Sequence, residues 1–88
     1  MTPALRPETA LAWLRSMSTD LEAAVVLDAR GRVLAGDAAL GARVAAGDRA
    51  LLLARSARHV VAVQPGRGAF RRLLELDVGT ALAALERP

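Results

Sequence analysis

The stretch of sequence that decides the fold is Glu22-Ala-Ala-Val-Val-Leu-Asp28-Ala-Arg-Gly31-Arg-Val-Leu-Ala-Gly36-Asp37. Its first half contains an unbroken apolar run at 23–27 with an acid at each end, which is typical of a buried strand. Residues 28–32 have the composition of a tight turn, in which Gly31 is free to adopt a positive φ. A second apolar run at 33–35 predicts another strand, which Gly36 ends. The stretch therefore predicts an antiparallel hairpin.

A helix is expected before this hairpin. Pro7 stands where the first turn of a helix accepts proline, and Glu8 suits the positive end of the helix dipole. The apolar residues that follow recur at helical spacing; they are Ala10, Trp13, Leu14, Met17 and Leu21. We predict an amphipathic helix that ends near residues 18–20, after a loose lead-in at 1–6.

Three further elements are expected between the hairpin and residue 68. Asp37 is a good N-cap for a short helix over Ala38–Ala46, which Gly41 weakens by roughly 1 kcal/mol relative to alanine. The apolar run at 50–54 and the valine-rich run at 59–64 predict two more strands. Glycines and a proline at 65–68 end the second of them.

The last segment reads as a helix with one apolar stripe, and a bend near residues 77–79 is compatible with Gly79. The stripe consists of Phe70, Leu73, Leu74, Val78, Ala81, Leu82 and Leu85. Both aromatic residues of the chain, Trp13 and Phe70, lie on apolar stripes, so we expect them in the core. The predicted fold is α/β of the α+β type: one domain over 1–88, an antiparallel sheet flanked by helices in the order α-β-β-α-β-β-α.

The composition limits the class of protein. Twenty of the 88 residues are alanine, so the core is thin, which favours self-association and argues against a cavity of ~300 Å³ or more. All twelve basic residues are arginine, and the net charge is only +3, which does not indicate a nucleic-acid binder. Disulfides and thiolate metal sites are excluded because the chain has no cysteine. No apolar run approaches the ~20 residues of a membrane span, and no secretory signal is evident, so we expect a cytoplasmic protein.

No group of residues predicts catalysis, a cofactor or a metal site. Ser56 precedes His59 by three residues, but no acid that could orient the histidine is evident in the sequence. The acids around the first strand, at 20, 22 and 28, suit caps and turns better than acid–base chemistry. The loop at 65–68 lacks the lysine and the spacing of a phosphate-binding loop. We therefore expect a protein that is not an enzyme.

Two groups of residues are candidates for contacts with other proteins. The apolar run Leu51, Leu52 and Leu53 is apolar on both faces of its strand, which predicts an exposed sheet edge that pairs with a second copy. Arg67, Arg71 and Arg72 form the densest basic group and are expected close together on a helix surface, as a partner site or as a solvated face.

The quoted hairpin and the order of elements resemble the roadblock/dynein light chain domain, a profilin-like sandwich, and the resemblance covers about residues 11–85. It implies homodimers or heterodimers that serve as platforms for small Ras-like GTPases. The middle helix of that family is longer than 38–46 and helps to build the dimer. We therefore predict a non-catalytic protein-interaction module that forms a homodimer and serves a small GTPase. The alternatives are a profilin-like sensory or ligand-binding domain and an arginine-mediated nucleic-acid binder.

Overall fold

The computed structural model describes residues 5–18 and 20–87, and this part of the chain forms three helices and four strands. They are α1 (Pro7–Met17), β1 (Leu21–Asp28), β2 (Val33–Gly36), α2 (Ala38–Ala45), β3 (Leu52–Arg55), β4 (His59–Pro65) and α3 (Arg71–Leu85). The predicted order α-β-β-α-β-β-α and the predicted antiparallel sheet are confirmed.

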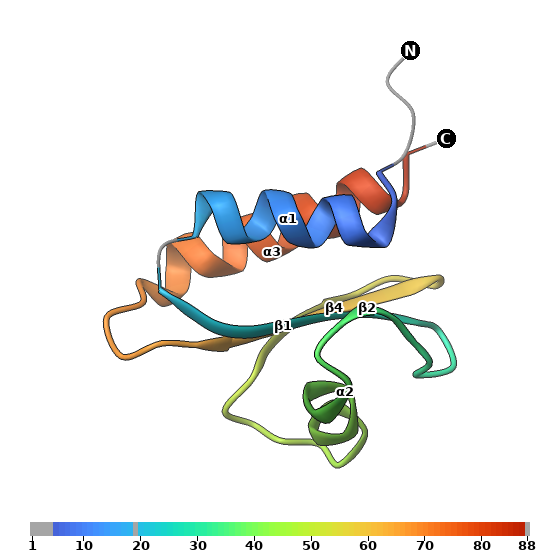
Figure 1. Cartoon of the computed structure of the whole chain (residues 1–88), viewed down its shortest axis with the longest axis horizontal. Coiled ribbons are helices and arrows are strands. Elements are labelled where there is room, and N and C mark those ends of the chain that lie inside the picture. Colours follow the sequence, from blue (N-terminus) through green and yellow to red (C-terminus); the bar gives the residue numbers. More distant parts are fainter. Residues whose placement is uncertain (1–4, 19, 88) are drawn as a thin grey trace.

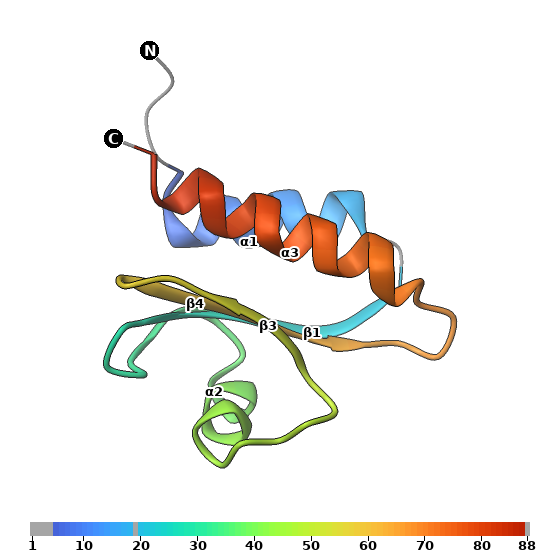
Figure 2. The same ribbon diagram turned by 180° about the vertical axis from the view of Figure 1, so that it is seen from behind.

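The four strands form one antiparallel sheet in the order β2-β1-β4-β3. Helices α1 and α3 lie side by side on one face of the sheet, and α2 covers the other face (Figure 1). The view from behind shows α3 running across the sheet above β3 and β4 (Figure 2). The central strands β1 and β4 are covered on both faces, which explains their nearly continuous apolar sequences.

The core has two layers because successive residues of a strand point to opposite faces of the sheet. Val26, Val61 and Val63 pack with α1 and α3 in the larger layer. Residues of the same strands that point the other way, such as Val25 and Leu27, pack with α2 in a smaller layer. The pairing of β1 with β4, which sets Val26 opposite Val61, holds both layers in register.

Local bonds fix the hairpin that the sequence predicts. The Asp28 carboxylate accepts hydrogen bonds from the backbone N–H groups of Arg30 and Arg32, both at 2.9 Å. Gly31 has a φ of +87°, as expected for this turn. After the hairpin, Asp37 accepts hydrogen bonds from the first N–H groups of α2 and so acts as the predicted N-cap.

Some expectations about the helices are wrong. Phe70, Leu73 and Met17 were expected in the core, but all three are exposed. The reason is that α3 contacts the sheet through one face only, formed by residues such as Leu74 and Val78, and the other apolar positions fall outside that face. Helix α3 also continues through Gly79 without a break.

Candidate interaction surfaces

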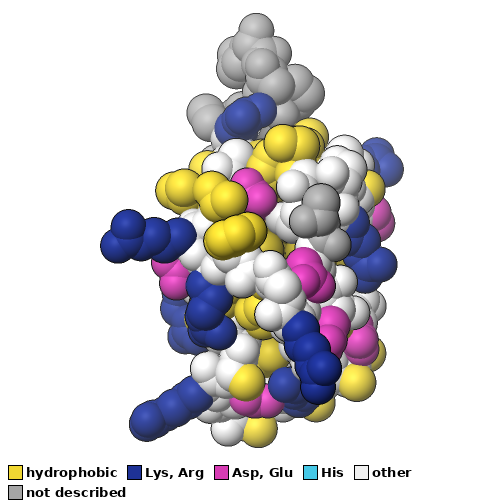
Figure 3. Space-filling model, turned by 90° about the vertical axis from the view of Figure 1, so that its left-hand side faces the viewer, with side chains coloured by type: hydrophobic (Ala, Val, Ile, Leu, Met, Phe, Trp, Pro, Cys, Tyr) yellow, Lys and Arg dark blue, Asp and Glu magenta, His cyan; other side chains and the backbone are white. Residues whose placement is uncertain are grey.

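Four large apolar side chains stand exposed at the end of the molecule where α1 finishes and α3 begins. Met17 is 56% exposed, Phe70 76%, Leu73 61% and Leu76 67%, and we call these four residues the α3 patch. Figure 3 views this end and shows hydrophobic side chains gathered on its upper part, with arginines projecting beside and below them. The sequence did not reveal the patch: Met17, Phe70 and Leu73 lie on the apolar stripes that were expected in the core, and Leu76 lies off them.

Hydrogen bonds between distant segments hold this end together. Ser18 Oγ at the end of α1 donates to Asp77 Oδ2 on α3 at 2.9 Å. Asp20 accepts a hydrogen bond from the backbone N–H of Gly68. An open hollow of ≈ 430 Å³ lies between these segments, lined by both acids and by three members of the α3 patch, Met17, Phe70 and Leu73. The sequence argues against a cavity of ~300 Å³ or more; this hollow is open and lies at the surface rather than in the core.

The glycine-rich loop at 65–68 serves as the strand-to-helix turn that the sequence predicts. Its backbone N–H groups at Gly66 and Gly68 both donate to Asp20, the first to the carbonyl and the second to the carboxylate. A Cβ atom at either glycine would collide with the Asp20 side chain. The carboxylate of Asp20 therefore occupies the position in this loop that an external anion would need.

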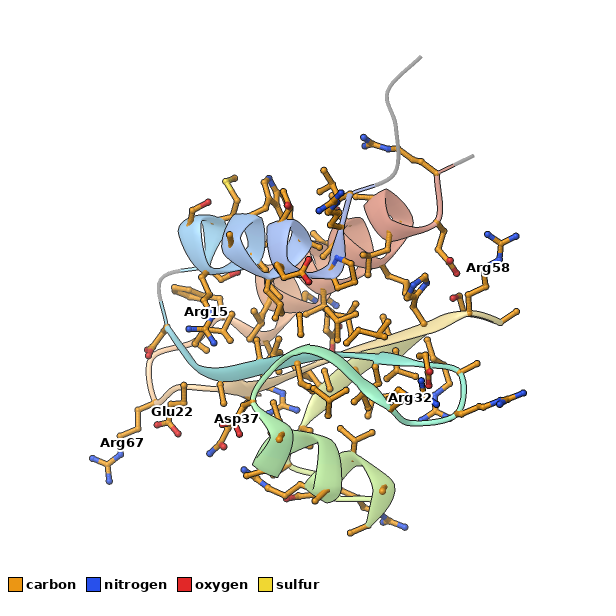
Figure 4. The ribbon with its side chains drawn as sticks, turned by 45° about the vertical axis from the view of Figure 1, so that its right-hand side comes forward. Arg15, Glu22, Arg32, Asp37, Arg58 and Arg67 are labelled. Atoms are coloured by element: carbon orange, nitrogen blue, oxygen red, sulfur yellow. The ribbon has the colours of Figure 1, made fainter. Side chains whose placement is uncertain are left out.

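The three candidate arginines do not all lie on one helix. Arg67 lies in the turn before α3 rather than on a helix, and Figure 4 shows it pointing outward from that loop. Arg71 and Arg72 are consecutive residues of α3, so their side chains leave the helix about 100° apart. All three are exposed, and none takes part in an ion pair within the described part of the chain. Arg72 is the one that flanks Leu73 and Leu76.

Strand β3 is an edge strand, hydrogen-bonded to β4 alone within the described residues. Of the three candidate leucines, Leu52 belongs to the core under α1 and α3, and Leu51, just before the strand, belongs to the core under α2. Leu53 is the exposed one, at 38%. It pairs with Ala62 and therefore lies on the α2 face, where α2 packs on β1 and β4.

Ser56 and His59 lie beside an acid that the sequence did not reveal. His59 Nδ1 is 2.9 Å from Glu86 Oε2 at the end of α3. However, Ser56 Oγ accepts hydrogen bonds from the backbone N–H groups of Arg58 and His59, at 3.2 and 3.1 Å, as a turn serine does. The Ser56 hydroxyl and the His59 imidazole hold the pKa of the Glu86 carboxyl below its usual value. The contact between His59 and Glu86 joins β4 to the end of α3.

The other acids make similar local contacts. The backbone N–H of Arg32 lowers the pKa of Asp28, with a further contribution from the N–H of Arg30. The N–H of Ala50 and the Arg43 side chain lower the pKa of Asp48. Within the described ranges, no three His, Asp or Glu side chains converge as metal ligands do.

No helix in the described part of the chain is both long enough and apolar enough to cross a membrane. Comparison with known proteins finds no match: no family model, curated protein or solved structure corresponds to the chain.

Proposed function

We propose that the chain is a non-catalytic protein-interaction module and that the α3 patch is its main contact surface. The observation that carries the proposal is the exposure of four large apolar side chains together at one end of the molecule. Burying one such side chain contributes about 1.5–3 kcal/mol, and contiguous apolar patches on proteins mark interaction sites more often than other surfaces do. A complex in which a macromolecular partner covers the patch would be stabilised by the burial of several such side chains.

The proposal includes a homodimer, for which the sequence predicts the β3 edge as contact. The open side of β3 and the exposed Leu53 support this contact, because a twofold pairing would continue the sheet into a second copy. Arg49 and Arg55 flank the leucines and would limit pairing to one partner. A lysine at Leu53 should remove an edge dimer without unfolding the chain, whereas a proline at the buried Leu52 should also unfold it.

The proposal extends to a small Ras-like GTPase as partner, which the roadblock resemblance implies. Its support is the hairpin at 22–37 and the order of elements. The short α2, eight residues long, offers less surface than the middle helix of that family. Titration of a purified small GTPase, loaded with GDP or with a GTP analogue, tests this part. Lack of binding in both states would remove the GTPase from the proposal and leave the interaction module intact.

A second candidate function is binding of a small ligand, which the hollow beside the α3 patch favours. Its volume of ≈ 430 Å³ falls within the range of ligand pockets. Apolar side chains and the carboxylates of Asp20 and Asp77 line it, a combination that suits a ligand with an apolar body and a cationic group. Native mass spectrometry of protein purified from its own host tests this function through a retained mass.

The experiment that tests the main proposal is affinity capture from the native host with tagged wild-type chain and with a tagged Leu73→Lys/Leu76→Lys variant. Both substituted residues are exposed, so we expect the variant to keep the fold, which circular dichroism checks. Proteins that bind through the α3 patch should be enriched on the wild type and lost on the variant. Identical sets of captured proteins would contradict the proposal.

A further inference from the structure

We infer that the α3 patch is covered by a second copy of this chain, with the two α3 helices antiparallel to each other. The inference rests on the interaction role proposed for the patch and names the partner. It differs from the β3 edge dimer, because it joins the outer face of the α1 and α3 layer and leaves the sheet edges free.

Two faces of helix α3 carry apolar residues, and within the part of the chain that the structure describes only one of them is buried. The first face, with Leu74, Val78, Ala81 and Leu85, is buried against the sheet and α1. The second is exposed and follows helical spacing, with Leu73 and Leu76 in the first half of the helix and the smaller Thr80 and Ala83 in the second half. A helix with apolar stripes on two sides is typical of one that packs between two layers.

The exposed area is large enough for a dimer contact. The four side chains of the α3 patch together expose on the order of 500 Å², if a complete large side chain offers about 200 Å². Two copies would therefore bury about 1,000 Å² of apolar surface from these residues alone. That is about the area a specific interface needs before its polar rim is counted. Of the large apolar side chains that are exposed in the described residues, the β3 edge supplies Leu53 alone.

The shape of α3 suits an antiparallel pairing with itself. If Leu73 of one copy lies opposite Leu76 of the other, twofold symmetry makes the same contact twice. This register brings Phe70 level with Gly79 of the second copy. At Gly79, apart from the adjoining residues and the backbone of the helix itself, no described atom lies within 4 Å of the position that a Cβ would take, so a bulky side chain can approach the helix there.

The charges beside the stripe also favour a second copy. Arg72 and Glu75 lie on the side of the stripe away from α1, both are exposed, and neither takes part in an ion pair within the described residues. A twofold antiparallel pairing keeps this flank of one helix next to the same flank of the other. In the register above, Arg72 is offset from Glu75 of the second copy by two residues, about 3 Å along the helix axis. Each copy thus supplies the cation for the acid of the other.

The first test uses single cysteines, because the chain has none of its own. Leu76→Cys places the thiol on the patch, Leu53→Cys places it on the β3 edge, and Arg30→Cys places it on the exposed hairpin turn as a control. Under mild oxidation at about 50 μM, we expect Leu76→Cys to form a covalent dimer at least about ten times faster than Arg30→Cys. Equal rates for the two variants would overturn the inference.

The second test reverses the charges. Arg72→Glu and Glu75→Arg should each raise the dimer dissociation constant by about tenfold, because each places like charges together twice in the dimer. The double variant Arg72→Glu/Glu75→Arg restores the opposite charges and should return the constant to within about threefold of the wild type. Sedimentation equilibrium measures all four proteins. A double variant that dimerises as weakly as the single variants would contradict this pairing.

Lysine variants separate this inference from the proposed function. A dimer lost on Leu76→Lys supports the inference, whether or not Leu53→Lys also weakens it. A dimer that survives Leu76→Lys but is lost on Leu53→Lys overturns the inference and leaves the edge dimer standing. A wild-type chain that stays at 9.2 kDa at 100 μM also overturns it. If the α3 patch then still captures a different protein, the proposed interaction role stands although the dimer inference is overturned.

Discussion

Gly31 and Gly36 both adopt a positive φ, of +87° and +98°, but their surroundings differ. Beyond the two adjoining residues, no described atom lies within 4 Å of the place that a Cβ would take at Gly31. At Gly36 a Cβ would collide with the carbonyl oxygen of Ala24 and would lie 2.8 Å from Leu11 Cδ1. A side chain at Gly31 therefore strains the backbone alone, whereas one at Gly36 also displaces α1 from the sheet.

This difference predicts unequal effects of alanine at the two positions. Gly31→Ala should lower the free energy of unfolding by about 1 kcal/mol, which is the usual cost of a positive φ outside glycine. Gly36→Ala should lower it by more than about 2 kcal/mol, because overpacking is added to the strain. Urea denaturation of both variants measures the two values, and equal losses would contradict the close packing at Gly36.

The three acids with lowered pKa values predict how stability depends on pH. Asp28, Asp48 and Glu86 each have a folded-state pKa below the usual value. Their contribution to stability is therefore complete above the unfolded-state pKa values, near pH 4, and is lost as the pH falls through the lower folded values. We expect the denaturation midpoint to fall steadily below pH 4. Asp28→Asn should reduce that slope, and an unchanged slope would show that protonation of Asp28 does not contribute to the loss of stability in acid.

Each of the helices α2 and α3 contains a glycine, and the two glycines are not equivalent. Gly41 in α2 is buried, and a Cβ there would lie 2.9 Å from Val33 Cγ2, so this helix needs a glycine to approach β2 closely. Gly79 in α3 has open space around it. From the sequence we expect a weakened helix at Gly41 and a bend near Gly79, since helix propensity does not depend on neighbours outside the helix.

Alanine should therefore have opposite effects in the two helices. Gly79→Ala should raise the free energy of unfolding by about 0.5–1 kcal/mol through helix propensity. At Gly41 the same gain is offset by overpacking, so Gly41→Ala should be neutral or destabilising by about 1 kcal/mol. Thermal melts at submicromolar concentration, where a dimer dissociates, measure the effect on the single chain. A raised melting temperature for Gly41→Ala would show that α2 can move away from the sheet to make room for the methyl group.

The described part of the molecule exposes seven large apolar side chains, and self-association that buries some of them would couple this surface to stability. If two copies pair, the melting temperature should rise with protein concentration, because only folded chains can form the dimer. We expect a rise of several degrees between 1 and 100 μM for the wild type and, for a dimer formed through the α3 patch, almost none for Leu76→Lys. Differential scanning calorimetry measures both. A wild-type melting temperature independent of concentration would contradict every dimer proposed for this chain.

The candidate surfaces could be predicted only in part. The position of β3 at a sheet edge follows from four strands in an open sheet. Which leucine of that strand remains exposed depends on how far α2 covers one face of the sheet and how far α1 and α3 cover the other. These contacts form only in the tertiary structure. In the same way, the helical repeat that predicts α3 assigns Leu73 and Leu74 to one stripe, although the sheet covers only the second of them.

The sequence by itself determined the features that depend only on residues close together along the chain. The hairpin at 22–37 follows from short-range geometry, with a glycine turn at Gly31, an Asp28 carboxylate that reaches only two and four residues ahead, and the Asp37 N-cap. Only the tertiary structure decided the contacts that join Ser18 to Asp77 and His59 to Glu86, because these residues lie 59 and 27 positions apart. It also decided that Met17, Phe70, Leu73 and Leu76 stay outside the core. The physical reason is that periodicity defines the apolar sides of a helix, whereas the number of layers packed against it defines how many of those sides are buried.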